Sequence, residues 1–199
     1  MKTRRSTRFK ILRTAERLFQ LRGYHGFSYK DISVPLGIKN AAIHYHFPSK
    51  EDLGIALIKR YRRLLDRLAS RFYEHETDPR EALEVYFRFH SRWTQSEELG
   101  CPIAVVSSNY SIIPEGMKAE ARALIDETLG WLNDVLIRGR ESGQFSFPGT
   151  AKERGIAVQA SLQGAAELAR IGGPHLLEVA IESLRQDFQL KPQLTTVTG

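Results

Sequence analysis

The stretch FSYKDISVPLGIKNAAIHYHFPSKEDL, residues 27–53, decides the fold of this 199-residue chain. Ser28 and Asp31 have the spacing of a capping box, which predicts that a short helix begins there, and Gly37 is placed to end it. A second short helix is expected over about 39–46, because a proline follows it. Two short helices separated by a glycine turn predict a helix-turn-helix, whose second helix enters the major groove of DNA.

Helical periodicity supplies a small core for this motif. The helix expected over 8–22 places apolar residues on one face, and Gly23 is placed to end it. The apolar residues expected to fix the crossing of the next two helices are Ile32, Leu36, Ile38, Ile43, Phe47 and Leu53.

Positive charge is concentrated at the N-terminus. Residues 1–50 contain eleven Lys and Arg residues against Glu16 and Asp31, a net charge of +9. Because the whole chain carries +6, the remaining residues sum to −3. A basic head on a slightly acidic body indicates that the head meets a polyanion such as DNA or RNA. The alternatives are a membrane surface, or a merely solubilising tail without a partner.

The rest of the chain is predicted to be helical. Capping residues and glycine or proline breaks predict further helices over about 49–74, 78–98, 102–110, 114–142, 150–171 and 174–190. No useful alternation typical of β-strands and no internal repeat is found. The expected fold class is therefore all-α with about nine helices: an N-terminal three-helix helix-turn-helix head at 1–48 and a larger helical body at 49–199.

Two features bear on the compartment. No apolar stretch approaches the roughly 20 residues that a membrane span needs, and no apolar signal core follows the basic N-terminus. The single cysteine, Cys101, has no internal disulfide partner. We therefore expect a cytoplasmic protein without a membrane partner.

The pattern of glycine, proline and capping residues in the head resembles that of the TetR family of transcription regulators. The resemblance covers roughly residues 8–60 and rests on GYHGFS at 23–28, Asp-Ile at 31–32, Gly-Ile at 37–38 and HFPSKEDL at 46–53. It implies a body that binds a ligand and dimerises, and usually a repressor released from its operator by that ligand. The implied partners are a palindromic DNA operator, an unknown small-molecule effector and a second copy of the chain. No cofactor is expected.

The recognition helix provides the candidates for base contacts. Lys39 and Asn40 open it, and lysine can donate to guanine while asparagine can bond adenine at two points. Ala41 and Ala42 are small, so they allow close approach to the base edges.

Other residues are candidates for phosphate contacts. The resemblance implies such contacts for His44, Tyr45, His46 and Lys50. The helix N-terminus at Tyr29 and Lys30 favours phosphate as well, and the arm of Arg4, Arg5 and Arg8 is a candidate for backbone or minor-groove contacts.

Two residues depart from the family pattern. The family usually has tyrosine where His44 stands. We therefore expect the phosphate contact at this position to be weaker and pH-sensitive. Pro35 interrupts the second helix, so we expect its C-terminal half to be irregular. His44 and His46 are not expected to bind a metal, because residues two apart on a helix point to nearly opposite sides.

The body contains candidate ligand contacts. Aromatic and polar side chains at helical spacing could line a pocket for a small apolar ligand, or could be ordinary core. These residues are Tyr86, Phe89, His90, Trp93, Tyr110, Met117 and Trp131. Cys101, expected at a helix N-terminus, is either a sensor of electrophiles or oxidants, as in some TetR-like regulators, or an inert small hydrophobe.

The last two helices carry small and apolar residues on their faces, which would suit a four-helix dimer interface or packing within the subunit. The residues are Ala157, Ala160, Ser161, Gly164, Ala165 and Leu168, followed by Leu176, Leu177, Ala180, Ile181, Leu184 and Phe188. We expect ligand binding to move the helix over 49–74, which joins the body to the head.

Other functions compete with this one. An enzyme is not expected, because no phosphate loop, paired cysteines or other catalytic motif is found. A structural or interaction protein whose basic head binds membranes or RNA is the third hypothesis. The sequence leaves the sign of regulation open, so an activator is an alternative to a repressor.

Overall fold

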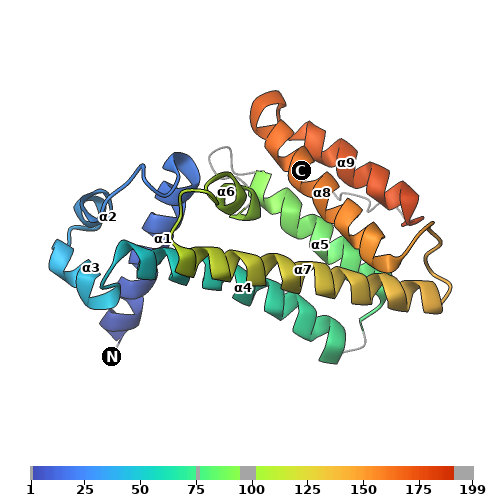
Figure 1. The fold of residues 1–199 in the computed structure, drawn as a ribbon, viewed down its shortest axis with the longest axis horizontal. Coiled ribbons are helices and arrows are strands. Elements are labelled where there is room, and N and C mark those ends of the chain that lie inside the picture. Colours follow the sequence, from blue (N-terminus) through green and yellow to red (C-terminus); the bar gives the residue numbers. More distant parts are fainter. Residues whose placement is uncertain (1, 75–76, 95–101, 191–199) are drawn as a thin grey trace, which may run out of the picture. The chain divides into compact units, whose positions relative to one another are not determined.

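The computed structural model describes residues 2–74, 77–94 and 102–190, and this part of the chain forms nine α-helices and no strand (Figure 1). The helices are α1 (Lys2–Arg22), α2 (Tyr29–Leu36), α3 (Asn40–His46), α4 (Lys50–Glu74), α5 (Pro79–Thr94), α6 (Pro102–Ser108), α7 (Glu115–Glu141), α8 (Ala151–Gly172) and α9 (His175–Asp187). The predicted all-α fold class is confirmed. None of the described helices is long and apolar enough to cross a membrane.

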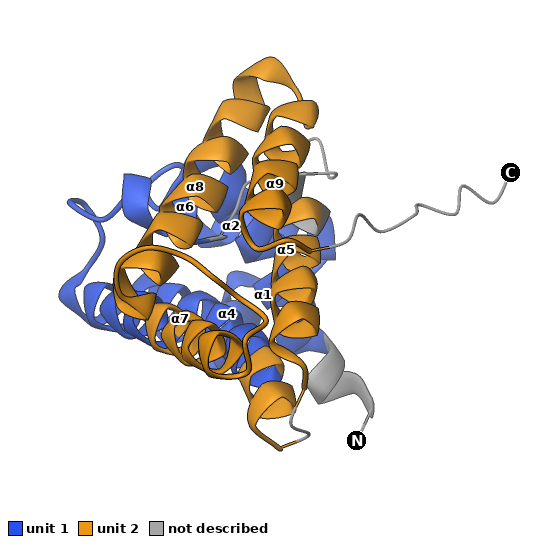
Figure 2. Ribbon diagram, turned by 90° about the vertical axis from the view of Figure 1, so that its right-hand side faces the viewer, with its two compact units in different colours: residues 1–67, 98–127 blue, residues 68–97, 128–199 orange. Residues whose placement is uncertain are grey.

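The chain divides into two compact units (Figure 2). Unit 1 comprises residues 1–67 and 98–127, and unit 2 comprises residues 68–97 and 128–199. Two of the three boundaries fall inside α4 and α7, so each of these helices contributes residues to both units.

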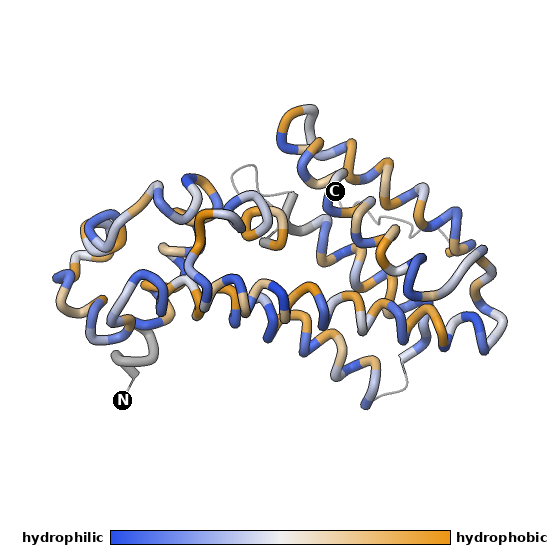
Figure 3. The backbone as a smooth tube through the Cα atoms, viewed as in Figure 1, coloured by the Kyte–Doolittle hydropathy of each residue, from blue (hydrophilic) through white to orange (hydrophobic). Residues whose placement is uncertain are grey.

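Unit 1 contains the helix-turn-helix. Four of the six residues predicted for its small core are buried, namely Ile32, Ile43, Phe47 and Leu53, while Leu36 and Ile38 are half-buried. Ile11, Ala15 and Phe19 of α1 are buried as well. Hydrophobic and hydrophilic residues recur along the helices of the described chain, as expected where each helix buries one face (Figure 3).

The turn between α2 and α3 follows from local chemistry. At the start of α2 the Ser28 hydroxyl and backbone N–H both donate to the Asp31 carboxylate, at 2.6 and 2.8 Å. These two bonds, that of the hydroxyl first, lower the pKa of Asp31. Gly37 ends α2 in the left-handed region, at φ 61°. Its N–H donates to the Val34 carbonyl, and that of Ile38 donates to the Ser33 carbonyl at 3.1 Å. These two bonds form a Schellman motif, which turns the chain sharply into α3.

Some helix limits differ from the predicted ones. The expected irregularity in α2 was wrong: the helix continues through Pro35 to Leu36, because a proline in the last turn removes only one backbone donor. α1 begins at Lys2 rather than near residue 8. The expected end of α5 near residue 98 lies outside the described residues.

The segment after α6 is bonded to the head within unit 1. The Asn109 side chain accepts a hydrogen bond from the Tyr24 backbone N–H at 3.0 Å. Glu51 of α4 accepts one from the backbone N–H of Gly116 at 3.2 Å. Arg62 of α4 pairs with both Glu120 and Glu127 of α7. These contacts explain why residues 98–127 belong to the same unit as the head.

Unit 2 is built from α5, α8 and α9, which pack against one another, and from parts of α4 and α7 (Figure 1). A two-point ion pair joins α9 to α5, with Arg185 donating to the nearly buried Glu84 at 2.8 and 2.9 Å. Thr150 and Glu153 form the predicted capping box at the start of α8.

A pair of glycine variants tests the conformation of the α2–α3 turn. Gly37→Ala is expected to destabilise the protein by about 1 kcal/mol, because the left-handed region disfavours a residue with a Cβ. A Cβ at Gly37 would meet no atom within 4 Å, so no steric clash contributes to this effect. Urea unfolding measures the change.

Gly130→Ala is the matched control for that variant. Gly130 also has open space around it but lies inside α7, so alanine is expected to stabilise the protein there by about 0.8 kcal/mol. Equal effects of the two alanines would contradict the assigned turn.

Candidate nucleic-acid interface

α3 buries one side chain, Ile43, and exposes most of the others. The exposed residues are Asn40, Ala41, His44 and Tyr45, together with Lys39, which is the N-cap; Ala42 and His46 are half-buried. Tyr45 is 62% exposed although it is large and aromatic. The helix is thus fixed from one side and presents polar and small side chains on the other.

Tyr29 ties α2 to the end of α3. Its hydroxyl donates to the Phe47 carbonyl at 2.8 Å, and its ring packs edge-on against His44 with centroids 4.7 Å apart. Burial and the nearby Asp52 carboxylate raise the pKa of Tyr29 to about 12, so the phenol keeps its proton. A phosphate contact by this phenol would therefore require the bond to Phe47 to break.

Lys50 has a similar anchoring contact. Its ammonium donates to the Phe27 carbonyl and lies 4.9 Å from the ring centre of Tyr24 and 4.5 Å from that of Phe27. Partial burial lowers the pKa of Lys50. An ammonium has three hydrogens, so one bond to a carbonyl leaves others for a phosphate.

The remaining predicted phosphate contacts lie nearby in unit 1. Lys30 is exposed in the first turn of α2. Arg8 is exposed on α1, with its guanidinium 4.9 Å from the ring centre of Phe47, the C-cap residue of α3. The side chains of Arg4 and Arg5 lie outside the described residues.

Comparison with known proteins decides the family. The family model described as "Bacterial regulatory proteins, tetR family" matches residues 11–57. A TetR-family transcriptional regulator from Agrobacterium tumefaciens has a solved structure that is 31% identical, with a TM-score of 0.85, and the match covers 93% of this chain and 98% of that one. The chain belongs to the TetR family. It is a DNA-binding transcriptional regulator.

Two curated regulators are similar to it. The uncharacterized HTH-type transcriptional regulator YxaF of Bacillus subtilis is 30% identical over 121 residues, which are 59% of this chain and 63% of YxaF, so this match spans less than two thirds of YxaF. The HTH-type transcriptional repressor NemR of Escherichia coli K12 is 25% identical over 175 residues, 85% of this chain and 86% of NemR.

In unit 2, three of the predicted ligand contacts lie together. The Tyr86 ring centre lies 4.8 Å from that of His90 and 5.1 Å from that of Trp131, and all three residues are at most 3% exposed. Tyr86 donates to Gln159 of α8, a buried polar residue that the sequence analysis missed. Both ring nitrogens of His90 and the Trp131 Nε1 are buried and have no hydrogen-bond partner among the described residues. Phe89 is half-buried beside His90.

The other predicted ligand contacts do not belong to this cluster. Met117 is buried in unit 1. Its sulfur packs so closely against Gly54 that a Cβ on this glycine would clash with it. Tyr110 is also in unit 1, and its hydroxyl accepts from Arg122 at 2.7 Å. The Trp93 side chain and Cys101 lie outside the described residues.

The buried imidazole of His90 is expected to make the free energy of unfolding depend on pH. Burial lowers the pKa of His90 from 6.5 to about 4. Between these values the unfolded chain binds a proton that the folded chain does not, so stability falls as the pH drops from 6.5 towards 4. The full loss is about 3 kcal/mol. His90→Leu is expected to flatten this dependence in urea unfolding series across pH.

His175→Leu, at an exposed position on α9, is the control for the histidine substitution. Its stability should keep the acid dependence of the parent protein. An unchanged slope in His90→Leu would show that the imidazole does not carry the dependence.

Proposed function

We propose that the protein is a dimeric repressor that binds a palindromic operator and releases it when a small-molecule effector binds the body. The observation that carries this proposal is the exposure of Lys39, Asn40 and Tyr45 beside the buried Ile43, within residues 1–50, whose net charge is +9. The E. coli relative is named a repressor, which supports this sign of regulation.

The proposed roles follow the exposure of α3. Lys39 and Asn40 read base edges, while Ala41 and Ala42 allow close approach. Backbone phosphates are contacted by exposed groups at Lys30, His44 and Tyr45, by the half-buried His46, and by the free hydrogens of Lys50. Tyr29 supports this surface mainly by holding the end of α3.

The proposed dimer face lies on α8 and α9. Ile156, Leu168 and Ile171 are 45%, 59% and 91% exposed and recur with Gly164 on one face of α8. A Cβ at Gly164 would meet no atom of the described residues within 4 Å, so packing among them gives no reason for a glycine there. A second copy lying close to α8 would give one, because glycine lets two helices approach. Val179 of α9, 64% exposed, extends the apolar surface.

The proposed effector site includes the buried cluster of Tyr86, His90 and Trp131. The unpartnered polar atoms of His90 and Trp131 each cost free energy unless something bonds them. An effector with an aromatic body and hydrogen-bonding groups would supply partners for these atoms. The same atoms in a sealed core would only destabilise the protein.

Selection of bound DNA from a random pool tests the main proposal. It is expected to return a palindrome, and a ligand screen on the selected duplex is expected to find a compound that releases the protein. Asn40→Ala should cost about 1–3 kcal/mol of binding free energy and relax the preference at one position in each half-site.

Lys30→Ala is the matched control for Asn40→Ala. It is expected to weaken binding about equally on all sequences and to reduce the salt slope by about 1. A preserved sequence preference in Asn40→Ala would reject the base-reading role.

Gly164→Leu tests the dimer face. The leucine would fill the space into which a second copy is proposed to fit, so sedimentation should show a shift from dimer to monomer. Gly130→Leu, in equally open space on α7, should leave the dimer unchanged. Dimers of equal stability in both variants would place the interface elsewhere.

A further inference from the structure

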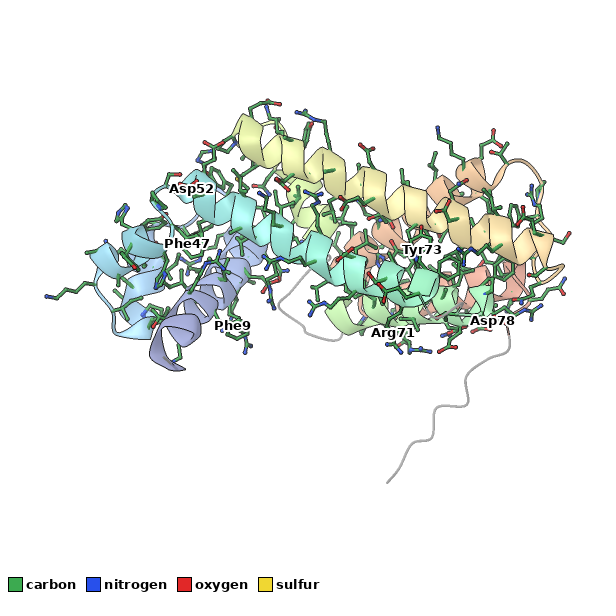
Figure 4. The ribbon with its side chains drawn as sticks, turned by 90° about the horizontal axis from the view of Figure 1, so that it is seen from below. Phe9, Phe47, Asp52, Arg71, Tyr73 and Asp78 are labelled. Carbon is green, nitrogen blue, oxygen red and sulfur yellow. The ribbon has the colours of Figure 1, made fainter. Side chains whose placement is uncertain are left out.

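A groove of about 860 Å³ runs between α1, α3 and α4 inside unit 1. It is open to solvent, and four arginines contribute to its walls. The lining includes Arg8 of α1, Tyr45 and His46 of α3, and Arg60, Arg63 and Arg67 of α4. Figure 4 labels Phe9 on α1, which is 48% exposed.

Some cations of α4 are neutralised within unit 1. Lys59 pairs with Glu120 at 3.3 Å, and Arg62 pairs with the same carboxylate and with Glu127. Arg60 lies 3.4 Å from Glu16, a buried carboxyl of α1. The charge on these faces of α4 is therefore balanced by acidic residues of α1 and α7.

Arg63 and Arg67 have no such partner. Among the described residues, no ion pair involves either side chain, and their Nε atoms donate only to backbone carbonyls of α4 at 3.1 Å. Both are exposed and stand four residues apart, where like charges repel along a helix. Asp66 is the carboxylate that lines the groove with them. With Arg60 paired to Glu16, Asp66 stands against three arginines, which leaves a surplus of positive charge.

The groove continues the exposed surface of α3. Tyr45 and His46, from the last turn of α3, form part of its wall. Both residues are among those proposed to contact phosphate. A strand of DNA whose bases meet the start of α3 therefore has a cationic channel beside the other end of the same helix.

We propose that this groove binds phosphates of the DNA backbone through Arg63 and Arg67, outside the contacts made by α3. Arginine suits this role because its planar guanidinium bonds two oxygens of one phosphate. The proposal rests on the operator binding proposed above. A small anionic effector is the competing occupant, but an effector site normally buries most of its ligand, and this groove is open.

The salt dependence of DNA affinity tests the proposal. Each phosphate contact contributes about 0.9 to the slope of log K against log salt concentration. The Arg63→Ala, Arg67→Ala double variant should therefore lower the magnitude of the slope by about 1.8, on operator and on unrelated duplex alike. Alanine favours helix, so α4 is expected to stay folded, and circular dichroism checks this.

Two controls separate local contact from overall charge. Lys152→Ala with Arg170→Ala removes the same charge from exposed positions of α8 and should leave the slope unchanged. Arg63→Lys with Arg67→Lys keeps the charge and should restore most of the slope. An unaltered slope in the alanine variant, or an equal loss in the α8 variant, would overturn the groove assignment. Absence of salt-dependent DNA binding in the parent protein would instead reject the proposed function.

Discussion

The DNA-facing surface proposed for this regulator depends on the burial of Ile43. α3 has only seven residues, too few to form a stable helix by itself in water, and Ile43 is the one side chain that it buries. The bond from Tyr29 to the Phe47 carbonyl holds the following residue, and the glycine turn at Gly37 sets the direction of entry. With these three constraints in place, Asn40, Ala41 and Tyr45 can stay exposed.

The cations of α4 divide in a similar way into those held by other residues of unit 1 and those left exposed. Cations of α4 that face acidic residues of unit 1 are paired, as Arg62 is with Glu120 and Glu127, whereas Arg63 and Arg67 lack carboxylate partners among the described residues. Paired surface charges contribute little to stability and still less to binding, because their field is already balanced. Arg63 and Arg67 therefore remain available to an anion in the groove beside α3.

Much of the fold could be predicted because its signals are local. Capping at Ser28 and Thr150 and the stop at Gly37 each lie within a few residues of the helix ends that they determine. The early start of α1 could not be predicted, because residues 2–7 are polar and carry no apolar periodicity.

Contacts made across long sequence separations were also beyond prediction. Tyr29 and Lys50 bond carbonyls 18 and 23 residues away, so their anchoring contacts could not be inferred from local pattern. For the same reason the sequence does not distinguish Arg62, whose partners stand on α7, from Arg63 beside it.

The bond between His44 and the Pro48 carbonyl restricts the chemistry of that imidazole. A carbonyl oxygen only accepts, so the His44 Nδ1, 3.1 Å away, must carry the hydrogen. The other nitrogen, Nε2, is then the one left for a contact with DNA. A tyrosine at this position would instead present one hydroxyl, which both donates and accepts.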